Sequence, residues 1–187
     1  DIDGRTPLIY ASLNGHIEIV KYLIEQCEAD PEDKDNYIRS LLHFASNNGH
    51  IELVKYLVEE CHLNVEDKDN EGKTPLHYSS MKGQIEVVKY LVEQHHVNVE
   101  EKDNYVRTAL HYASLNGHIE VIKYLFEQHH VNVEAKDNNE WTPLNFASRN
   151  GHVEAVKYLV EQCHANVEAR DNEGKTPLHY ASIKGQI

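Results

Sequence analysis

Residues 74–94 read TPLHYSSMKGQIEVVKYLVEQ, and residues 108–128 read TALHYASLNGHIEVIKYLFEQ, so the same phrase returns after 34 residues. Related phrases begin, with the same spacing, at Thr6, Ser40, Thr142 and Thr176. One aspartate opens every unit of this period: Asp1, Asp35, Asp69, Asp103, Asp137 and Asp171. A fixed period of about 20–50 residues predicts an array of stacked units.

The period divides the chain into repeats, which we number first to sixth. The five complete repeats span residues 1–34, 35–68, 69–102, 103–136 and 137–170, and the partial sixth repeat spans residues 171–187. No stretch rich in Pro, Ser or Gly separates one repeat from the next. Residues 1–187 are therefore predicted to form a single domain, which we expect to be part of a longer array.

The third repeat shows the local structure that each repeat should adopt. Thr74 suits the N-cap of a short first helix, Pro75 suits its first turn, and Gly83 can end it in a left-handed conformation. A second helix follows, whose apolar residues recur at helical spacing: Ile85, Val88, Leu91 and Val92. Neither helix can bury its apolar face alone, so stacked neighbours must share one core.

The motif T-P-L-H-x-A on a helix–turn–helix unit resembles the ankyrin repeat. The resemblance covers the whole chain, and it implies an all-α ankyrin-repeat solenoid of stacked units with short extended or β-turn tips. The similarity among the repeats and the phrase KYLVEQ also resemble the long ankyrin arrays of protozoa. Irregularities such as Ala109 and Asn145 favour a natural array over an engineered consensus array.

Two departures from the family pattern affect the turns. Each repeat has one extra residue after the second helix, at Cys27-Glu28, Cys61-His62, His95-His96, His129-His130 and Cys163-His164. We expect that helix to be extended, or to be closed by a histidine in an unusual backbone conformation. At the tips, Ile38, Val106 and Glu140 stand where Gly4, Gly72 and Gly174 stand in other repeats, so we expect those tips to turn less sharply.

Composition limits the possible partners and the compartment. A formal net charge of −13 argues against binding to nucleic acid or to an anionic membrane. No apolar run approaches the ~20 residues of a membrane-spanning helix, so membrane insertion is not expected. The three cysteines, Cys27, Cys61 and Cys163, form no CxxC pair, which indicates free thiols in a reducing, cytoplasmic location.

The histidines could suggest metal chemistry, but their positions repeat with the scaffold. The pairs His95–His96 and His129–His130 lack a carboxylate at helical spacing, so we interpret them as helix-end residues and predict no metal and no cofactor. The motif histidines resemble the family's structural histidines, which hydrogen-bond between neighbouring turns: His43, His77, His111 and His179. A further column is predicted to cap the second helices: His16, His50, His118 and His152. No catalytic motif is present, so the chain is predicted not to be an enzyme.

Function is predicted from the repeat positions whose residue differs from one repeat to the next. In the ankyrin family the tips and the exposed side of the first helices form a concave surface that binds proteins. Carried onto this sequence, that surface includes eight candidate contact residues: Tyr37, Arg39, Met81, Tyr105, Arg107, Leu115, Trp141 and Arg149. Tyr, Trp and Arg are enriched at interaction hot spots. The glutamate columns of the second helices, such as Glu25, Glu59 and Glu127, are predicted to be a solvated face.

The expected partner is a protein with an apolar anchor and acidic flanks, because the fifth position of the repeats is rich in Arg and Lys. The alternative is an architectural spacer in a larger ankyrin-containing protein, such as a channel, a membrane-skeleton adaptor or an effector. Leu178, Ala181 and Ile183 are expected to leave an apolar edge, which predicts possible end-to-end self-association.

Overall fold

The computed structural model describes residues 1–183, and residues 184–187 lie outside the described part, as does the side chain of Ile183. Within the described part, eleven α-helices follow one another, two in each complete repeat and one in the sixth. The first helices are α1 (Pro7–Leu13), α3 (Leu41–Asn48), α5 (Pro75–Met81), α7 (Ala109–Asn116), α9 (Pro143–Arg149) and α11 (Pro177–Ile183). The second helices are α2 (Ile17–Cys27), α4 (Ile51–Glu59), α6 (Ile85–His95), α8 (Ile119–His129) and α10 (Val153–Glu161). The predicted all-α fold of helix–turn–helix repeats is confirmed.

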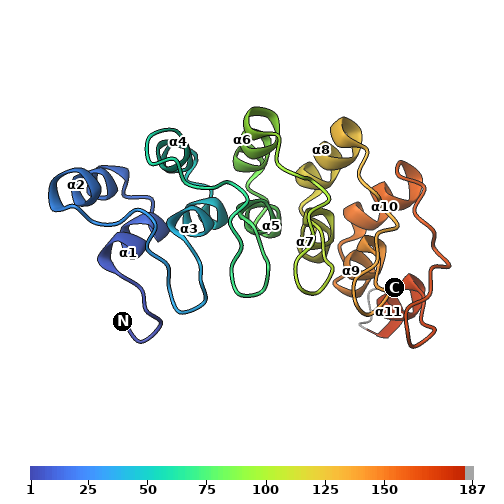
Figure 1. The fold of residues 1–187 in the computed structure, drawn as a ribbon. Coiled ribbons are helices and arrows are strands. Elements are labelled where there is room, and N and C mark those ends of the chain that lie inside the picture. The colour runs from blue at the N-terminus through green and yellow to red at the C-terminus, as the bar shows by residue number, and fades with distance from the viewer. Residues whose placement is uncertain (184–187) are drawn as a thin grey trace. The chain divides into compact units, whose positions relative to one another are not determined.

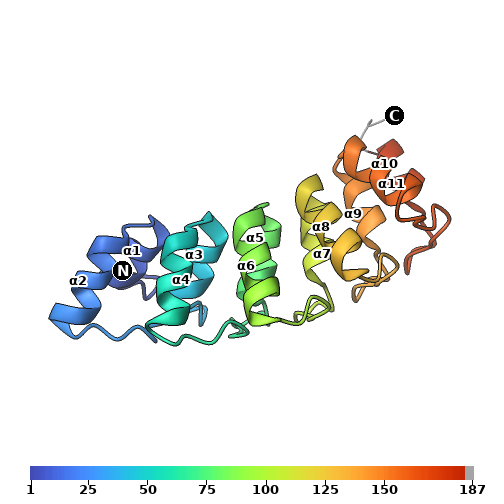
Figure 2. The same cartoon turned by 90° about the horizontal axis from the view of Figure 1, so that it is seen from above.

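The helices gather into two compact units, residues 1–97 (the N-terminal unit) and residues 98–187 (the C-terminal unit). In the N-terminal unit, α1, α3 and α5 pack in one row, and α2, α4 and α6 lie on one side of that row (Figure 1, Figure 2). In the C-terminal unit, α7, α9 and α11 form the corresponding row, with α8 packed on α7 and α10 on α9. The boundary between the units lies within the third repeat, and the single domain over residues 1–187 stays a prediction.

The first helices begin as the sequence predicts. The hydroxyl of Thr6 accepts a hydrogen bond from the Ile9 N–H at 3.3 Å, which satisfies one of the free donors of the first turn. In the second repeat Ser40 and His43 form a reciprocal capping box, in which the imidazole Nδ1 accepts the backbone N–H of Ser40 at 3.1 Å. The third, fourth and fifth repeats contain the same box, and proline occupies the first turn of α1, α5 and α9.

The core consists of leucines and β-branched residues that occupy equivalent positions in successive repeats. We call each such set of equivalent positions a column. In the first helices the column is Leu8, Leu42, Leu76, Leu110 and Leu144, all at most 2% exposed. In the second helices the buried columns include Val20, Val54, Val88 and Ile122, and also Leu57, Leu91, Leu125 and Leu159. Within each unit these residues are buried between packed helices, so the stacking of repeats creates the core of that unit.

Hydrogen bonds also join neighbouring repeats. His50 Nε2 lies 3.1 Å from the carbonyl oxygen of Leu13 in the preceding repeat, and His152 Nε2 lies 3.0 Å from that of Leu115. The prediction that this histidine column caps the second helices is wrong, since no side-chain cap bond forms at α2, α4, α8 or α10. The imidazoles of His50 and His152 bridge neighbouring repeats instead.

The sequence predicts that the glutamates of the second helices form only a solvated face. The structure shows instead that three of them accept hydrogen bonds from tyrosines. The hydroxyl of Tyr56 donates to Glu25 in the preceding repeat at 3.2 Å, and Tyr90 donates to Glu59 at 2.8 Å. In the C-terminal unit Tyr158 donates to Glu127 at 2.7 Å. One tyrosine–glutamate bond therefore connects the second helices at each of these junctions.

Candidate functional site

The turn at the tip of each repeat is held by the aspartate that opens the repeat. In the second repeat, Asp35 Oδ1 accepts hydrogen bonds from the backbone N–H groups of Tyr37 and Arg39, both at 2.9 Å. A carboxylate that bonds its own downstream backbone stabilises a turn without help from the turn's other side chains. The same arrangement occurs at Asp1, Asp69, Asp103, Asp137 and Asp171.

The fourth residue of each tip has a left-handed backbone whatever its side chain. Gly72 has a φ of 77°, while Ile38, Val106 and Glu140 have φ values of 62°, 64° and 62°. The prediction that tips without glycine turn less sharply is therefore wrong. The aspartate bonds impose the turn, and a β-branched residue such as Ile38 must accept a conformation that costs L-amino acids roughly 1–2 kcal/mol.

The second oxygen of the opening aspartate is bonded by a tyrosine in four repeats. In the third repeat, the hydroxyl of Tyr78 donates to Asp69 at 2.6 Å. Burial and this carboxylate raise the pKa of Tyr78 above the ordinary tyrosine value, which keeps the hydroxyl a donor. The equivalent pairs are Tyr10–Asp1, Tyr112–Asp103 and Tyr180–Asp171.

Arginine replaces the hydroxyl in the two repeats that have phenylalanine at this position. In the second repeat, with Phe44, the Arg39 Nε and Nη2 donate to Asp35 at 2.8 and 2.5 Å. In the fifth repeat, with Phe146, the donor comes from the fourth repeat, because Arg107 Nε donates to Asp137 at 3.0 Å. The carboxylates of both aspartates are buried, so each needs this partner.

Three of the eight predicted contact residues lie in the N-terminal unit. Tyr37 is 47% exposed, and its ring lies 4.9 Å from the guanidinium carbon of Arg39. Arg39 also lies 4.9 Å from the ring of Phe44, so its charged group is held between an aromatic pair and Asp35. Met81, at the end of α5, is half-buried. Of these three residues, Tyr37 is therefore the most exposed to solvent.

The fourth repeat resembles the second. Tyr105 is 44% exposed, and the guanidinium of Arg107 lies 5.4 Å from its ring. Arg107 is also 4.9 Å from the ring of Phe146 and is paired with Asp137. The sequences DNYIR (35–39) and DNYVR (103–107) thus give two similar tips, one in each unit, and each displays a tyrosine.

The remaining predicted residues surround a buried tryptophan. Trp141 is only 9% exposed and packs on Phe146 and Tyr180, with ring centroids 5.0 and 4.4 Å away. Leu115 packs against this aromatic cluster while half-buried, and the exposed Arg149 lies 5.0 Å from the Trp141 ring. Trp141 is therefore a packing residue between the fifth and sixth repeats and offers little surface to a partner.

The predicted contact set omits two exposed apolar residues at the tips, Ile2 and Ile38. Ile38, beside Tyr37, is 48% exposed at the tip of the second repeat. Its only signal in the sequence is that a β-branched residue stands at a glycine position. Together, Tyr37 and Ile38 form an apolar tip that the corresponding Glu71 and Gly72 of the third repeat do not provide.

The basic residues of the fifth column are already paired within the chain. Arg5 lies 3.4 Å from Asp3, and Lys175 lies 2.5 Å from Glu173. Lys73 pairs with Glu71, while Arg39 and Arg107 bind the buried aspartates. Positive charge on the tips is therefore largely neutralised before any partner arrives.

The paired histidines have structural roles at the ends of the second helices. His95 packs edge-on against Tyr90 with ring centroids 4.9 Å apart, and His129 packs similarly against Tyr124 at 5.2 Å. The following residue has a left-handed backbone in every complete repeat: Glu28, His62, His96, His130 and His164. Closure of the second helix by a histidine in an unusual backbone conformation is confirmed at α6 and α8. Glu28 takes this role at α2, whereas the cap residues of α4 and α10, Glu60 and Gln162, are right-handed. In residues 1–183 no group of His, Cys, Asp and Glu side chains is placed to hold a metal ion.

The motif histidines link repeats, as the family resemblance implied. His43 Nε2 lies 3.0 Å from the Lys73 carbonyl oxygen, and His111 Nε2 lies 3.2 Å from that of Trp141. Their Nδ1 atoms accept the cap N–H, so both rings are neutral with hydrogen on Nε2. Burial lowers the pKa of His111 to about 4.

Two of the three cysteines, Cys61 and Cys163, lack the low pKa of reactive thiols. All three are unpaired. Burial raises the pKa of Cys163 to about 11, and burial also raises that of Cys61. A thiol with a raised pKa is a poor nucleophile near neutral pH, since the thiolate is the reactive form.

Comparisons with known proteins agree with this architecture. A family model described as "Ankyrin repeats (3 copies)" matches residues 42–137 and 128–187, and one described as "Ankyrin repeat" matches residues 3–36. The chain is also similar to the mitochondrial liver isoform of glutaminase from Mus musculus, with 51% identity over 37 residues. That match covers 20% of this chain and 6% of the glutaminase, so it concerns a short segment of the enzyme. Among the described residues, no helix has the length and apolarity required to cross a bilayer. The chain belongs to the ankyrin repeat family.

Proposed function

We propose that the chain is a non-enzymatic protein-interaction module that binds a partner protein through its repeat tips and first helices. Ankyrin repeats are generally protein–protein interaction modules, and the observation that carries the proposal here is the pair of tyrosine tips. Tyr37 and Tyr105 are each more than two-fifths exposed on turns held by aspartate bonds. Exposed tyrosine on a rigid backbone is a favourable contact residue, because little side-chain entropy is lost on binding.

The tips support this function because the scaffold does not require their aromatic residues. The third and sixth repeats place Glu71 and Glu173 at the tyrosine position and keep the same turn bonds. The backbone bonds of the turn therefore form without a tyrosine at this position. A ligand is the simplest reason for exposed apolar residues on a left-handed turn, where Ile38 itself is strained.

The partner is proposed to carry an apolar anchor that contacts Tyr37, Ile38 or Tyr105. The prediction of acidic flanks in the partner has no support from the structure, because the basic residues at the tips are paired with the chain's own carboxylates. Arg149, which is exposed, is the basic residue proposed to contact the partner directly. Free thiols are compatible with the proposed cytoplasmic location.

The test places a photo-crosslinking amino acid at position 37 or 105 and, as a matched control, at Tyr22 of α2, which is also exposed. Crosslinking in extract should capture the same protein from positions 37 and 105, and not from position 22. A Tyr37→Ser/Tyr105→Ser variant should then lose that protein, whereas Ile19→Ser/Tyr22→Ser should retain it.

Equal crosslinking from all three positions, or retention of the protein by the tip variant, would contradict the proposal. The alternative, an architectural spacer without its own partner, predicts that no position captures a protein reproducibly. End-to-end self-association also stays a prediction, motivated by Leu178, which is 62% exposed. Sedimentation of the unmodified chain at increasing concentration tests it.

A further inference from the structure

The fifth repeat differs from the other repeats at two positions whose side chains are in contact. Its fifth residue is Trp141, where the other repeats carry an arginine or a lysine: Arg5, Arg39, Lys73, Arg107 and Lys175. Its thirteenth residue is Arg149, where the first four repeats carry an uncharged residue: Leu13, Asn47, Met81 and Leu115. The guanidinium carbon of Arg149 lies 5.0 Å from the centroid of the Trp141 ring. The fifth repeat therefore places its positive charge at the end of α9, on an indole ring, and not at the fifth position of the tip.

A first helix of this array does not depend on an arginine at its thirteenth position. The helices α1, α3, α5 and α7 all form with an uncharged residue there. Arg149 lies in the last turn of α9, where a cation interacts favourably with the helix dipole. A lysine would provide the same charge, so the helix itself gives no reason for a planar guanidinium at this position.

Within residues 1–183, Arg149 is the arginine whose guanidinium has no hydrogen bond or ion pair. Three other arginines pair with carboxylates of the chain: Arg5, Arg39 and Arg107. The guanidinium of Arg170 donates to the Gly174 carbonyl oxygen at 2.8 Å. Arg149 is exposed and rests on the ring of Trp141. Its N–H donors, which can bind a carboxylate through two parallel hydrogen bonds, are therefore available to a ligand.

The Trp141 ring is a fixed platform for this guanidinium. The ring packs on Phe146 and Tyr180, with ring centroids 5.0 and 4.4 Å away, and the residue is only 9% exposed. Contact with an aromatic face restricts the long arginine side chain and removes water from one side of its charge. A guanidinium that is already oriented loses less conformational entropy when it binds an anion.

An aliphatic side chain lies beside this charge. Leu115, in the last turn of α7, packs against the same aromatic cluster and is half-buried. The amide of Asn150, which follows Arg149, donates to the Leu115 carbonyl oxygen at 3.1 Å, so the ends of α7 and α9 are joined here. The surface therefore offers an aliphatic contact next to an unpaired guanidinium, and we call it the Leu115–Arg149 patch.

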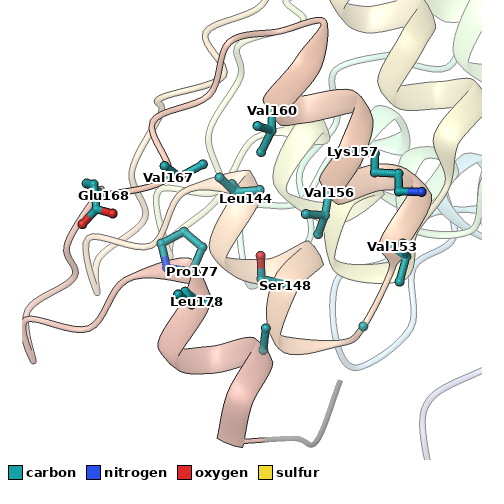
Figure 3. A pocket seen from close by; sticks show the side chains of 12 residues that line it. Leu144, Ser148, Val153, Val156, Lys157, Val160, Val167, Glu168, Pro177 and Leu178 are labelled. Atoms are coloured by element: carbon teal, nitrogen blue, oxygen red, sulfur yellow. The ribbon is translucent and has the colours of Figure 1, made fainter. Parts of the chain in front are cut away.

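The surroundings of Arg149 differ from those of the apolar groove in the C-terminal unit. Leu144 and Ser148, also in α9, line this groove of about 440 Å³ together with residues of α10 and α11 (Figure 3). The groove corresponds to the face that a following second helix covers in the other repeats, so it belongs to the stacking of the array. Arg149 does not line the groove, and α9 packs against both α7 and α11 in the row of first helices. The exposure of Arg149 is therefore not that of an uncovered end.

We propose that the Leu115–Arg149 patch binds the side-chain carboxylate of an aspartate or glutamate of the partner protein, together with a neighbouring aliphatic residue. This inference rests on the proposed function and names the chemistry of one contact. The carboxylate accepts two N–H groups of Arg149, and the aliphatic residue packs on Leu115. A phosphate group suits the patch less, because recognition of phosphate uses clusters of arginines and because the chain carries a formal net charge of −13.

The test selects binders from a phage library of short random peptides that are fused at their C-termini, so that only side chains supply carboxylates. Peptides selected by the full chain should share an aspartate or glutamate at a fixed spacing from an aliphatic residue. Selection on Arg149→Met should yield peptides without the shared acidic residue, because methionine offers no donors. Lys157→Met, which removes an exposed cation of α10, is the matched control and should select the same acidic peptides as the unmodified chain.

The affinity of one selected peptide, measured by fluorescence anisotropy, then locates the contact. Arg149→Met should weaken binding about tenfold, and Arg149→Lys about fivefold, because lysine keeps the charge in the last turn of α9 but lacks the planar pair of donors. Replacing the acidic residue of the peptide with its amide should weaken binding to the unmodified chain about tenfold. The same replacement should not weaken binding to Arg149→Met, since both changes remove the same contact.

Two results would overturn this proposal and leave the proposed function intact. One is a set of selected peptides that share no acidic residue. The other is an acidic peptide that Arg149→Met binds as tightly as the unmodified chain does. If the unmodified chain enriches no peptide, the carboxylate proposal also fails, and crosslinking from positions 37 and 105 decides the proposed function separately.

Discussion

The second and third repeats are neighbours in the N-terminal unit, and they build the same tip from different side chains. The second repeat reads DNYIRSLLHF (35–44), and the third reads DNEGKTPLHY (69–78). Both use the opening aspartate to bond the turn. They differ in what satisfies the second carboxylate oxygen, which is Arg39 in one and Tyr78 in the other.

This difference shows which parts of a tip are fixed by the fold. The buried aspartate needs a donor, and either an arginine or a tyrosine hydroxyl will serve. Once that donor is present, the hydrogen bonds of the turn form whatever side chains the third and fourth residues of the tip carry. Sequence variation at Tyr37 or Ile38 therefore carries information about binding, whereas variation at Arg39 and Phe44 carries information about the aspartate.

The largest expected effect comes from removing the arginine donor. Arg39→Met leaves the buried carboxylate of Asp35 with only its backbone bonds, and should lower the free energy of unfolding by roughly 2–4 kcal/mol. Adding Phe44→Tyr should recover more than half of that loss, because a tyrosine there can donate to Asp35 as Tyr78 donates to Asp69. Urea denaturation of the single and double variants measures both values.

The third repeat supplies the control for this experiment. Lys73→Met removes a cation at the equivalent position, but Tyr78 still bonds Asp69, so the expected loss is below about 1 kcal/mol. If Lys73→Met cost as much as Arg39→Met, or if Phe44→Tyr recovered nothing, the equivalence of the two donors would be wrong.

An intermediate effect is expected from the capping histidine, which the second, third and fourth repeats share. Burial lowers the pKa of His111 in the fourth repeat from 6.5 to about 4. The unfolded chain therefore binds a proton that the folded chain does not, and the free energy of unfolding decreases as the pH falls from about 6.5 to about 4. Between pH 7 and pH 5 this single residue should contribute a loss of about 2 kcal/mol.

The fifth repeat provides a cap that does not titrate. Asn145 Oδ1 accepts the Thr142 N–H at 3.0 Å, in place of an imidazole. His111→Asn should therefore reduce the loss of stability between pH 7 and pH 5 by about 2 kcal/mol, measured by urea denaturation at both values. An unchanged pH dependence would mean that His111 titrates alike in the folded and unfolded chain.

The smallest effect concerns the strained tip. Ile38→Gly should stabilise the chain by about 0.5–1 kcal/mol, because glycine adopts a φ of 62° without the clash of a β-branched residue. Ile38→Asn should give a smaller gain, since asparagine tolerates this region. A thermal melt that falls with both variants would show that Ile38 makes a stabilising contact of its own. The gain in stability should coincide with weaker capture of the partner.

Much of this fold could be predicted from the sequence, because the signals are local and repeated. A cap residue such as Thr74 followed by Pro75, and apolar residues at helical spacing, predict each helix without knowledge of its neighbours. The repetition then predicts the stacking. The prediction for the turn at Ile38 is wrong because the left-handed backbone does not depend on glycine there; the bonds of Asp35 impose it.

The candidate site was harder to predict, because a column in the sequence does not say where a side chain points. Trp141 occupies the same repeat position as Arg39 and Lys73, yet it packs against Phe146 and Tyr180. Burial of its large apolar ring stabilises the fold more than exposure would. Similarly, the position of His50 in the sequence predicts a cap on its own helix, although its ring reaches the Leu13 carbonyl of the repeat before it.

The burial of Trp141 has a practical consequence for optical spectroscopy. It is the only tryptophan in the chain, and its ring lies within the aromatic cluster that joins the fifth and sixth repeats. Tryptophan emission therefore follows this junction alone, while far-ultraviolet circular dichroism follows the helices of every repeat. A denaturation recorded with both signals distinguishes local opening of the last repeats from loss of the whole array, without the addition of an extrinsic dye.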